Sequence, residues 1–362
     1  MREKSLLIIS TGGTIAQTRS EGEGTTVNKG DQGAKTFAEA LGKALAEVNI
    51  SKENVHAIQI MDIDSSNLVP RHWEQMIDAI VDNYNDHDMF LLTHGTNTMG
   101  YTTAALSFAL ENLGKPVVVT GSQVPLKYAG TDALSNLEKS VMVAAYPDMA
   151  GVITVFGSRI IIGTRTKKMT EFGLDAFASF KTSPLGEVGS KGVHIKQSDL
   201  DAYLAFYGSK ARFSRDLRVS KNFDMHIASF TEFPGMTSEF LIDAVKGSNI
   251  RGIVMRTSGA GDPNVLPENK KDEHENLRQA FQYLSDNKIP VVITTHAPDG
   301  VASMDINTPG REARALGAIP AWDMSIESMT VKLGWLLGQK LSYEEINAKM
   351  LTSLKGEIVA HK

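Results

Sequence analysis

Short apolar runs alternate with longer amphipathic stretches along the first half of the chain. The apolar runs cover residues 6–9, 55–60, 89–93, 117–120 and 152–156. Continuous runs of this kind are typical of strands that are buried on both faces of a parallel sheet. Helical spacing of apolar residues occupies the stretches between them, at 37–48, 73–84, 98–113 and 131–145. The alternation predicts a doubly wound α/β unit in which helices join parallel strands.

The pattern weakens after residue 180 and returns near residue 226. Proline, several glycines and mixed charge fill the interval, which is typical of a linker. Further on, the sequence predicts strands at 226–230, 250–255 and 290–295, and helices at 238–245, 273–285, 326–337 and 343–351. We therefore expect a larger N-terminal domain with a doubly wound, mostly parallel sheet, a linker, and a smaller C-terminal α/β domain. Their expected bounds are 1–185, 186–224 and 225–362.

Composition and charge narrow the classes of function. A chain of 362 residues suits two domains of ordinary size. Lys and Arg number 37 against 42 Asp and Glu, so the chain lacks the broad basic field that favours nucleic acid as a partner. The absence of cysteine excludes disulfides, thiolate metal sites and cysteine nucleophiles. The first apolar run is too short for a signal peptide, and no run approaches the roughly 20 residues of a membrane span. We expect a cytoplasmic protein.

Polar, hydroxyl-rich segments follow several of the predicted strands. They read TGGT at 11–14, DSSN at 64–67, THGTNT at 93–98 and GSQ at 121–123, and Lys168 lies beyond the fifth strand. Glycine turns after strands are common for conformational reasons alone. However, ligands collect outside the carboxyl ends of parallel strands, so several such segments in register predict one shared crevice.

Two threonine hydroxyls and a lysine in this crevice suggest nucleophilic acyl transfer. A hydroxyl becomes an effective nucleophile when a base removes its proton, and a lysine serves as that base in its neutral form. No phosphate-binding loop, serine-hydrolase elbow or dinucleotide fingerprint occurs in the sequence. The histidines include no close metal-ligand pair, and we expect His94 to be a neutral side chain that bonds the local backbone. We predict no metal and no cofactor.

Taken together, the segments TGGTIA at 11–16 and THGTNTM at 93–99 resemble the two signature segments of bacterial-type L-asparaginases. The resemblance runs nearly end to end. The segments LSFALENLGKP at 106–116, VTGSQ at 119–123 and GLDAF at 173–177 are most similar to the cytoplasmic type I branch. This resemblance implies an amidohydrolase that converts L-asparagine to L-aspartate and ammonia through an acyl-enzyme on a threonine. It leaves glutamine open as a secondary substrate.

The resemblance also assigns expected catalytic roles. Thr14 matches the family nucleophile, and Thr96 matches the second threonine, which works with the lysine matched by Lys168. Backbone N–H groups near Gly13 and Thr96 are the expected oxyanion donors, because preorganised dipoles best stabilise a developing negative charge. A homodimer or homotetramer is implied, since the family completes each site with a neighbouring subunit.

The resemblance also assigns expected substrate-binding roles, and the chain departs from the family at some of these positions. Ser65 matches the residue that holds the substrate's α-carboxylate, and Ser66 lies beside it. The family's aspartate for the α-ammonium is replaced by Asn97, whereas the stretch that reaches the neighbouring site has Asp262 where relatives have an asparagine. We therefore expect a compensating exchange, in which Asp262 of a partner subunit supplies the missing charge. The loop at 19–26 lacks the family's usual tyrosine.

Two other classes of function remain open at this stage. The changes at Asn97 and in the loop are compatible with an amino-acid-binding or sensory protein that kept the fold and lost efficient catalysis. Retention of Thr14, Thr96 and Lys168 favours the enzyme, because a binder needs no nucleophile and base. The third class is the amidase subunit of a tRNA-dependent amidotransferase. It ranks last because such subunits carry an extra N-terminal domain, whereas here the first motif begins by residue 11.

Overall fold

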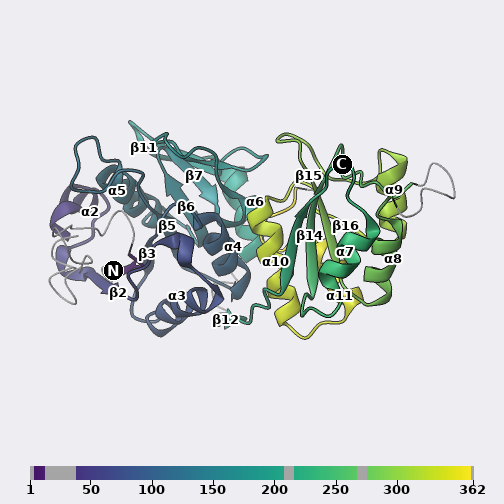
Figure 1. The fold of residues 1–362 in the computed structure, drawn as a ribbon. Coiled ribbons are helices and arrows are strands. Elements are labelled where there is room, and N and C mark those ends of the chain that lie inside the picture. The colour runs from purple at the N-terminus through teal and green to yellow at the C-terminus, as the bar shows by residue number, and fades with distance from the viewer. Residues whose placement is uncertain (1–3, 13–37, 208–215, 267–274, 360–362) are drawn as a thin grey trace, which may run out of the picture. The chain divides into compact units, whose positions relative to one another are not determined.

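A computed structural model describes residues 4–12, 38–207, 216–266 and 275–359 of the chain (Figure 1). The chain divides into two compact units, Met1–Lys221 and Asn222–Lys362. Both are mixed α/β structures, with a large, mostly parallel sheet in the first and a smaller parallel sheet in the second. The fold class predicted from the sequence is confirmed.

The sheet of the first unit has eight strands in the part that is described, in the order β11-β10-β7-β6-β5-β3-β1-β2. The strands from β2 to β6 are parallel, and β7, β10 and β11 extend the sheet in antiparallel fashion. Four central strands are buried along their whole length, which explains their continuous apolar sequences. The bounds are β1 Leu6–Ser10, β2 Val55–Gln59, β3 Met89–Thr93, β5 Pro116–Thr120, β6 Gly151–Phe156, β7 Arg159–Ile162, β10 Gly186–Gly189 and β11 Gly192–Ile195.

Helices cover this sheet, and short elements fill the remaining connections. Helix α5 packs on β3, β5 and β6 and against α2, while α4 packs on β6 and against α3. Two ribbons, β4 with β12 and β8 with β9, lie outside the main sheet. The bounds are α2 Gly42–Glu47, α3 Pro70–Asp82, α4 Met99–Ala109, α5 Ala133–Ala144, α6 Gln197–Tyr207, β4 Leu110–Glu111, β8 Thr166–Lys168, β9 Phe177–Ser179, β12 Arg218–Val219, and the short helices η1 Lys52–Asn54, η2 Ser65–Asn67 and η3 Gly163–Arg165.

The segment 186–224, expected to be a linker, instead carries regular structure. It contains β10, β11 and α6, and the compact units divide after Lys221. The glycines that suggested a linker lie at the ends of a hairpin, where Gly189 pairs with Gly192. Gly192 has a positive φ of 87°, a conformation that glycine adopts without steric cost. Turn chemistry, rather than a domain boundary, accounts for the composition of this stretch.

The strand order places a switch point between β1 and β3. The chain leaves β1 for β2 on one side and then crosses to β3 on the other, so β1 lies between them. The carboxyl ends of these strands are in register, with Ser10 beside both Gln59 and Thr93. Open α/β sheets bind ligands in the crevice at such a point.

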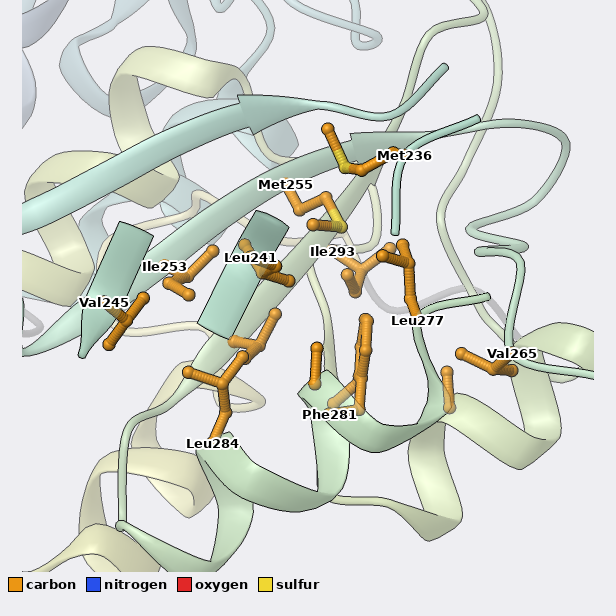
Figure 2. Packing of buried hydrophobic residues seen from close by; sticks show 14 of the residues in the cluster. Met236, Leu241, Val245, Ile253, Met255, Val265, Leu277, Phe281, Leu284 and Ile293 are labelled. Atoms are coloured by element: carbon orange, nitrogen blue, oxygen red, sulfur yellow. The ribbon is translucent and has the colours of Figure 1, made fainter. Parts of the chain in front are cut away.

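The second unit has a parallel sheet of four strands within its described residues, in the order β13-β14-β15-β16. Helix α10 packs on β14, whereas α7 and α8 pack against each other and share a hydrophobic cluster with the sheet. Figure 2 shows Leu241 and Phe281 from these helices against Ile253 and Ile293 of the sheet. The bounds are β13 Ile227–Thr231, β14 Gly252–Thr257, β15 Val291–Thr295, β16 Ile319–Pro320, α7 Ser238–Val245, α8 Arg278–Asp286, α9 Thr308–Ala315, α10 Ile326–Gly338 and α11 Tyr343–Met350.

Among the described residues, no helix has the length and apolar character needed to cross a membrane.

Candidate active site

The loops that follow β1, β3 and β5 are joined by short hydrogen bonds. The backbone N–H and the hydroxyl of Thr11 both donate to the carbonyl of Thr93, at 3.2 and 2.9 Å. The N–H of His94 donates to the carbonyl of Thr120 at 2.9 Å. The hydroxyl-rich segments predicted at these strand ends therefore lie together, at the switch point of the sheet.

The backbone at Gly12 leaves no room for a side chain. Its φ is 91°, and a Cβ atom there would lie 2.7 Å from the backbone nitrogen of Ile63 and 2.8 Å from the Cα of Asp62. The N–H of Ile63 also donates to the carbonyl of Thr11 at 3.1 Å. The first signature segment thus turns sharply against the loop after β2, which only glycine permits in this conformation.

Lys168 and Thr96 meet at this edge of the sheet. The Nζ atom of Lys168 donates to Thr96 Oγ1 at 2.9 Å and to Asn97 Oδ1 at 3.1 Å. Lys168 lies beyond the fifth predicted strand, as expected, and the chain forms β7 and η3 before it places Lys168 at the end of β8. A hydroxyl and an amine in hydrogen-bond contact are the elements of a nucleophile and its base.

Glu171 adds a carboxylate to the surroundings of Lys168. Its Oε2 atom lies 2.6 Å from Lys168 Nζ, and the side chains are 65% and 15% exposed respectively. Sequence reasoning did not single out Glu171. The signal available was its position three residues after a candidate catalytic lysine, which brings the two side chains within reach when the intervening residues turn.

Ser65 and Ser66 lie against the second signature segment. Asn97 Nδ2 donates to Ser66 Oγ at 2.8 Å, and the hydroxyl of Thr98 donates to the carbonyl of Ser65 at 2.8 Å. A Cβ atom at Gly95 would lie 2.7 Å from Ser65 Oγ, so the two loops are closely packed. The structure therefore brings together five of the predicted site residues: Ser65, Ser66, Thr96, Asn97 and Lys168.

His94 is a buried neutral side chain in this structure. Its Nδ1 lies 2.6 Å from the carbonyl of Gly95 and its Nε2 lies 2.9 Å from the hydroxyl of Thr102. A carbonyl can only accept, so Nδ1 carries the proton and Nε2 accepts from the hydroxyl. Burial lowers the pKa of His94 to about 4. The predicted bond to local backbone is confirmed.

The remaining predicted residues lie elsewhere. Gly13, Thr14 and the loop 19–26 fall outside the described residues, and Gly12 leads directly into them. Asp262 belongs to the second unit, where its Oδ2 accepts from the N–H of Ala260 at 3.0 Å and from Asn307 Nδ2 at 2.7 Å. Its Oδ1 is buried and has no hydrogen-bond partner in the described part of the chain. One carboxylate oxygen thus holds a turn, and the other keeps its accepting capacity.

Gln123 belongs to the predicted crevice segment 121–123, but no role was assigned to it from the sequence. Its Nε2 donates to the carbonyl of Glu171 at 2.6 Å and to that of Gly173 at 3.3 Å. Its own N–H donates to both carboxylate oxygens of Asp132, at 3.0 and 3.1 Å. Gln123 therefore fixes the loop after β8 to the start of α5.

Unused hydrogen-bonding capacity remains at the same edge of the sheet. The hydroxyls of Thr93 and Ser122, which lie at the ends of β3 and β5, are buried and have no partner among the described residues. Buried hydroxyls are nearly always bonded in folded proteins. These groups are therefore available to a ligand, to water or to the residues that follow Gly12.

Comparison with known proteins identifies the class to which this fold and site belong. The family model described as "Asparaginase, N-terminal" matches residues 5–201, and "Glutaminase/Asparaginase C-terminal domain" matches residues 226–350. The chain therefore belongs to the asparaginase family of amidohydrolases. It is 34% identical to L-asparaginase 1 of Escherichia coli strain K12 over 364 residues, which cover 99% of each chain.

Two further relatives bear on the type of enzyme. L-asparaginase I from Vibrio cholerae has a solved structure that matches with a TM-score of 0.80 and 30% identity, covering 99% of this chain and 100% of that one. One subunit of the glutamyl-tRNA(Gln) amidotransferase of Pyrococcus abyssi is 31% identical over 365 residues, covering 98% of this chain but 76% of its own length. The similarity to the type I branch is confirmed.

Proposed function

We infer that the protein hydrolyses the side-chain amide of L-asparagine to L-aspartate and ammonia. Matches to both family models and the full-length similarity to L-asparaginases support this substrate. The observation that carries the chemistry is the 2.9 Å hydrogen bond between Lys168 Nζ and Thr96 Oγ1 at the switch point. Hydrolysis of an amide needs a nucleophile and a base that removes its proton, and this pair supplies the base.

The reaction has two halves. In the first, the Thr14 hydroxyl attacks the amide carbon, and its proton ends on the departing nitrogen, which leaves as ammonia. The acyl-enzyme is then cleaved by water, which returns a proton to the threonine and releases aspartate. Lys168 in its neutral form, acting through the Thr96 hydroxyl, accepts and returns protons. Backbone N–H groups near Gly13 and Thr96 stabilise the oxyanion in each half.

Substrate binding is assigned to the polar groups beside this pair. Ser65 and Ser66 hold the α-carboxylate, and Asn97 offers polar contact without charge. We assign the charge partner of the α-ammonium to Asp262 of a neighbouring copy, whose Oδ1 has no hydrogen-bond partner among the described residues. The assignment requires a homodimer or homotetramer, which light scattering would measure. We place the protein in the cytoplasm.

Ammonia release from the purified protein tests the proposed reaction. L-asparagine, L-glutamine and D-asparagine are compared for wild type, Thr14→Ala and Lys168→Met. We expect turnover with L-asparagine and loss to background in both variants. If L-asparagine raises the melting temperature of wild type but no ammonia appears, the protein is an amino-acid binder and the proposal is wrong.

Asp262→Asn tests the charge partner separately. Losing the carboxylate is expected to raise KM for L-asparagine by at least tenfold, because charge-assisted hydrogen bonds contribute roughly 1.5–3 kcal/mol. The amide keeps one accepting oxygen, so the turn at Ala260 is retained. An unchanged KM and kcat would remove Asp262 from the site.

The similarity to an amidotransferase component supports a second candidate, in which the released ammonia serves a tRNA-bound substrate. The chain spans about three quarters of the length of that component. Co-purification of the tagged protein with a second protein and tRNA would favour this role. Asparagine turnover by the isolated protein at ordinary enzymatic rates would favour the simple hydrolase.

A further inference from the structure

Three oxygen atoms surround the Lys168 amine. They belong to Thr96 at 2.9 Å, Asn97 at 3.1 Å and Glu171 at 2.6 Å. An ammonium has three N–H donors, so each donor has an acceptor in this arrangement. Glu171 is the only one of the three acceptors that carries a charge.

The loop that carries Glu171 is held by the protein rather than by Lys168 alone. Gln123 donates to the carbonyls of Glu171 and Gly173, and the N–H of Gly173 donates to the hydroxyl of Thr170 at 3.4 Å. Because Gln123 is bonded in turn to Asp132, the backbone at Glu171 is held to the start of α5. The Glu171 side chain is 65% exposed, and its carboxylate is oriented by the ion pair with Lys168.

Other ionisable groups on the elements around β8 do not provide this charge. In the described sequence, α4 contributes only Tyr101 and β9 none, and β8 and η3 contribute the cations Lys167 and Arg165. The loop after β3 contributes His94, which burial keeps neutral.

Further carboxylates lie on the neighbouring loops. The Asp62 carboxylate lies against Gly12, and the Asp132 carboxylate accepts from the N–H groups of Gln123 and Val124. Asp64 accepts from the N–H of Ser66 at 2.8 Å. The Asp175 carboxylate lies against Gly157. Glu171 is thus the carboxylate paired with Lys168 among the described residues.

We propose that Glu171 is a positioning residue that orients the Lys168 amine toward Thr96. The proposal rests on the proposed function, in which Lys168 handles protons. The ion pair at 2.6 Å holds the amine in the direction of the threonine hydroxyl, with which it also bonds.

The split between kcat and KM for L-asparagine tests the proposal. Glu171→Gln keeps the size of the side chain and removes its charge, so kcat is expected to fall several-fold with KM near that of wild type, because the amine is less firmly oriented. Glu187→Gln, an exposed carboxylate on β10, is the matched control and leaves both constants in place.

Moving the charge provides a rescue that a merely structural residue would not give. Asn97 contacts the Lys168 amine, so Asn97→Asp places a carboxylate next to that amine. The double variant Glu171→Gln with Asn97→Asp therefore returns one carboxylate to the amine and is expected to recover kcat relative to Glu171→Gln. No recovery in the double variant would count against an orienting charge.

These results separate this proposal from the proposed function. If Thr14→Ala and Lys168→Met are inactive but kcat of Glu171→Gln equals that of wild type, the hydrolase stands and the role of Glu171 is wrong. If the protein releases no ammonia, the rate at which an amine-selective reagent labels Lys168, followed by peptide mass spectrometry, gives the same comparison. Identical labelling rates in wild type and Glu171→Gln would also overturn the role.

Discussion

His94 links the stability of the site to pH at the scale of a single residue. It lies between the second signature segment and α4, with both ring nitrogens bonded inside the protein. In the unfolded chain a histidine takes up a proton near pH 6.5, whereas burial in the folded protein lowers its pKa to about 4. Between these values the unfolded state binds more protons, so stability falls as the pH falls.

The burial of His94 predicts that the free energies of unfolding of wild type and His94→Gln converge as the pH falls. The side chain of His94 contributes stability that is complete above pH 6.5 and declines by about 3 kcal/mol by pH 4. Urea unfolding from pH 7.5 to 4 should therefore show wild type losing its advantage over the variant. His194→Gln, an exposed histidine on β11, is the control. Parallel curves for wild type and His94→Gln would contradict the burial argument.

At the scale of elements, tight turns bring the three strand-end loops together. The Gly12 turn has no space for a Cβ atom and a positive φ, whereas Gly130 has a positive φ of 77° but open space around it. Gly189 has neither restriction. The three positions separate the cost of backbone conformation from the cost of a clash.

Alanine substitutions at these glycines are expected to have graded effects. Gly189→Ala should change the free energy of unfolding little, and Gly130→Ala should cost about 1–2 kcal/mol through the left-handed conformation. Gly12→Ala adds a clash with backbone atoms and should cost more than either. It should also lower kcat by roughly 100-fold, because displacing the adjoining loop moves reacting groups. Equal effects at Gly12 and Gly130 would show that the turn can relax.

The sequence predicted fully buried strands and complete helical periods better than it predicted short strands with exposed positions. Strand β3 and helix α7 have the predicted bounds, because a long apolar run or a complete helical period identifies each. The hairpin of β10 and β11 was taken for a linker, since its short strands alternate with glycine and have exposed positions.

Side-chain contacts at the site were predictable only in part. Hydroxyl-rich segments at strand ends indicated one crevice, and the structure brings these segments together. The contacts of Lys168 with Glu171 and of Gln123 with the loop after β8 depend on the path of two separate loops. No periodic pattern in the sequence predicts the path of these loops.

At the scale of the whole molecule, a buried ion pair fixes the end of the chain. Lys332 of α10 and Glu357 are fully buried and 2.6 Å apart. Lys332 Nζ also donates to the carbonyls of Met350 and Thr352, at 3.2 and 2.7 Å. Burial raises the pKa of Glu357, but the ion pair and the N–H groups of residues 354 and 355 outweigh it and hold that pKa below its ordinary value.

Removing one partner of this ion pair is expected to lower the free energy of unfolding more than replacing both partners. Glu357→Leu or Lys332→Met leaves one buried group without its charge partner and should cost about 3–5 kcal/mol. The double variant Lys332→Met with Glu357→Leu removes both charges and should be more stable than either single variant. Urea unfolding of all four proteins measures the coupling. Additive losses in the double variant would show that the two side chains act independently.

The origin of Lys168 on a two-stranded ribbon outside the main sheet has an evolutionary consequence. Strands β1, β3 and β5 share register with their neighbours, so an insertion in any of them disturbs the whole frame. Among the described residues, the strands of the β8–β9 ribbon pair with each other and not with the main sheet. Residues 169–175 between them are exposed or half-buried. The charge around Lys168 can therefore change by substitution in residues 169–175 while the strands of the main sheet keep their register.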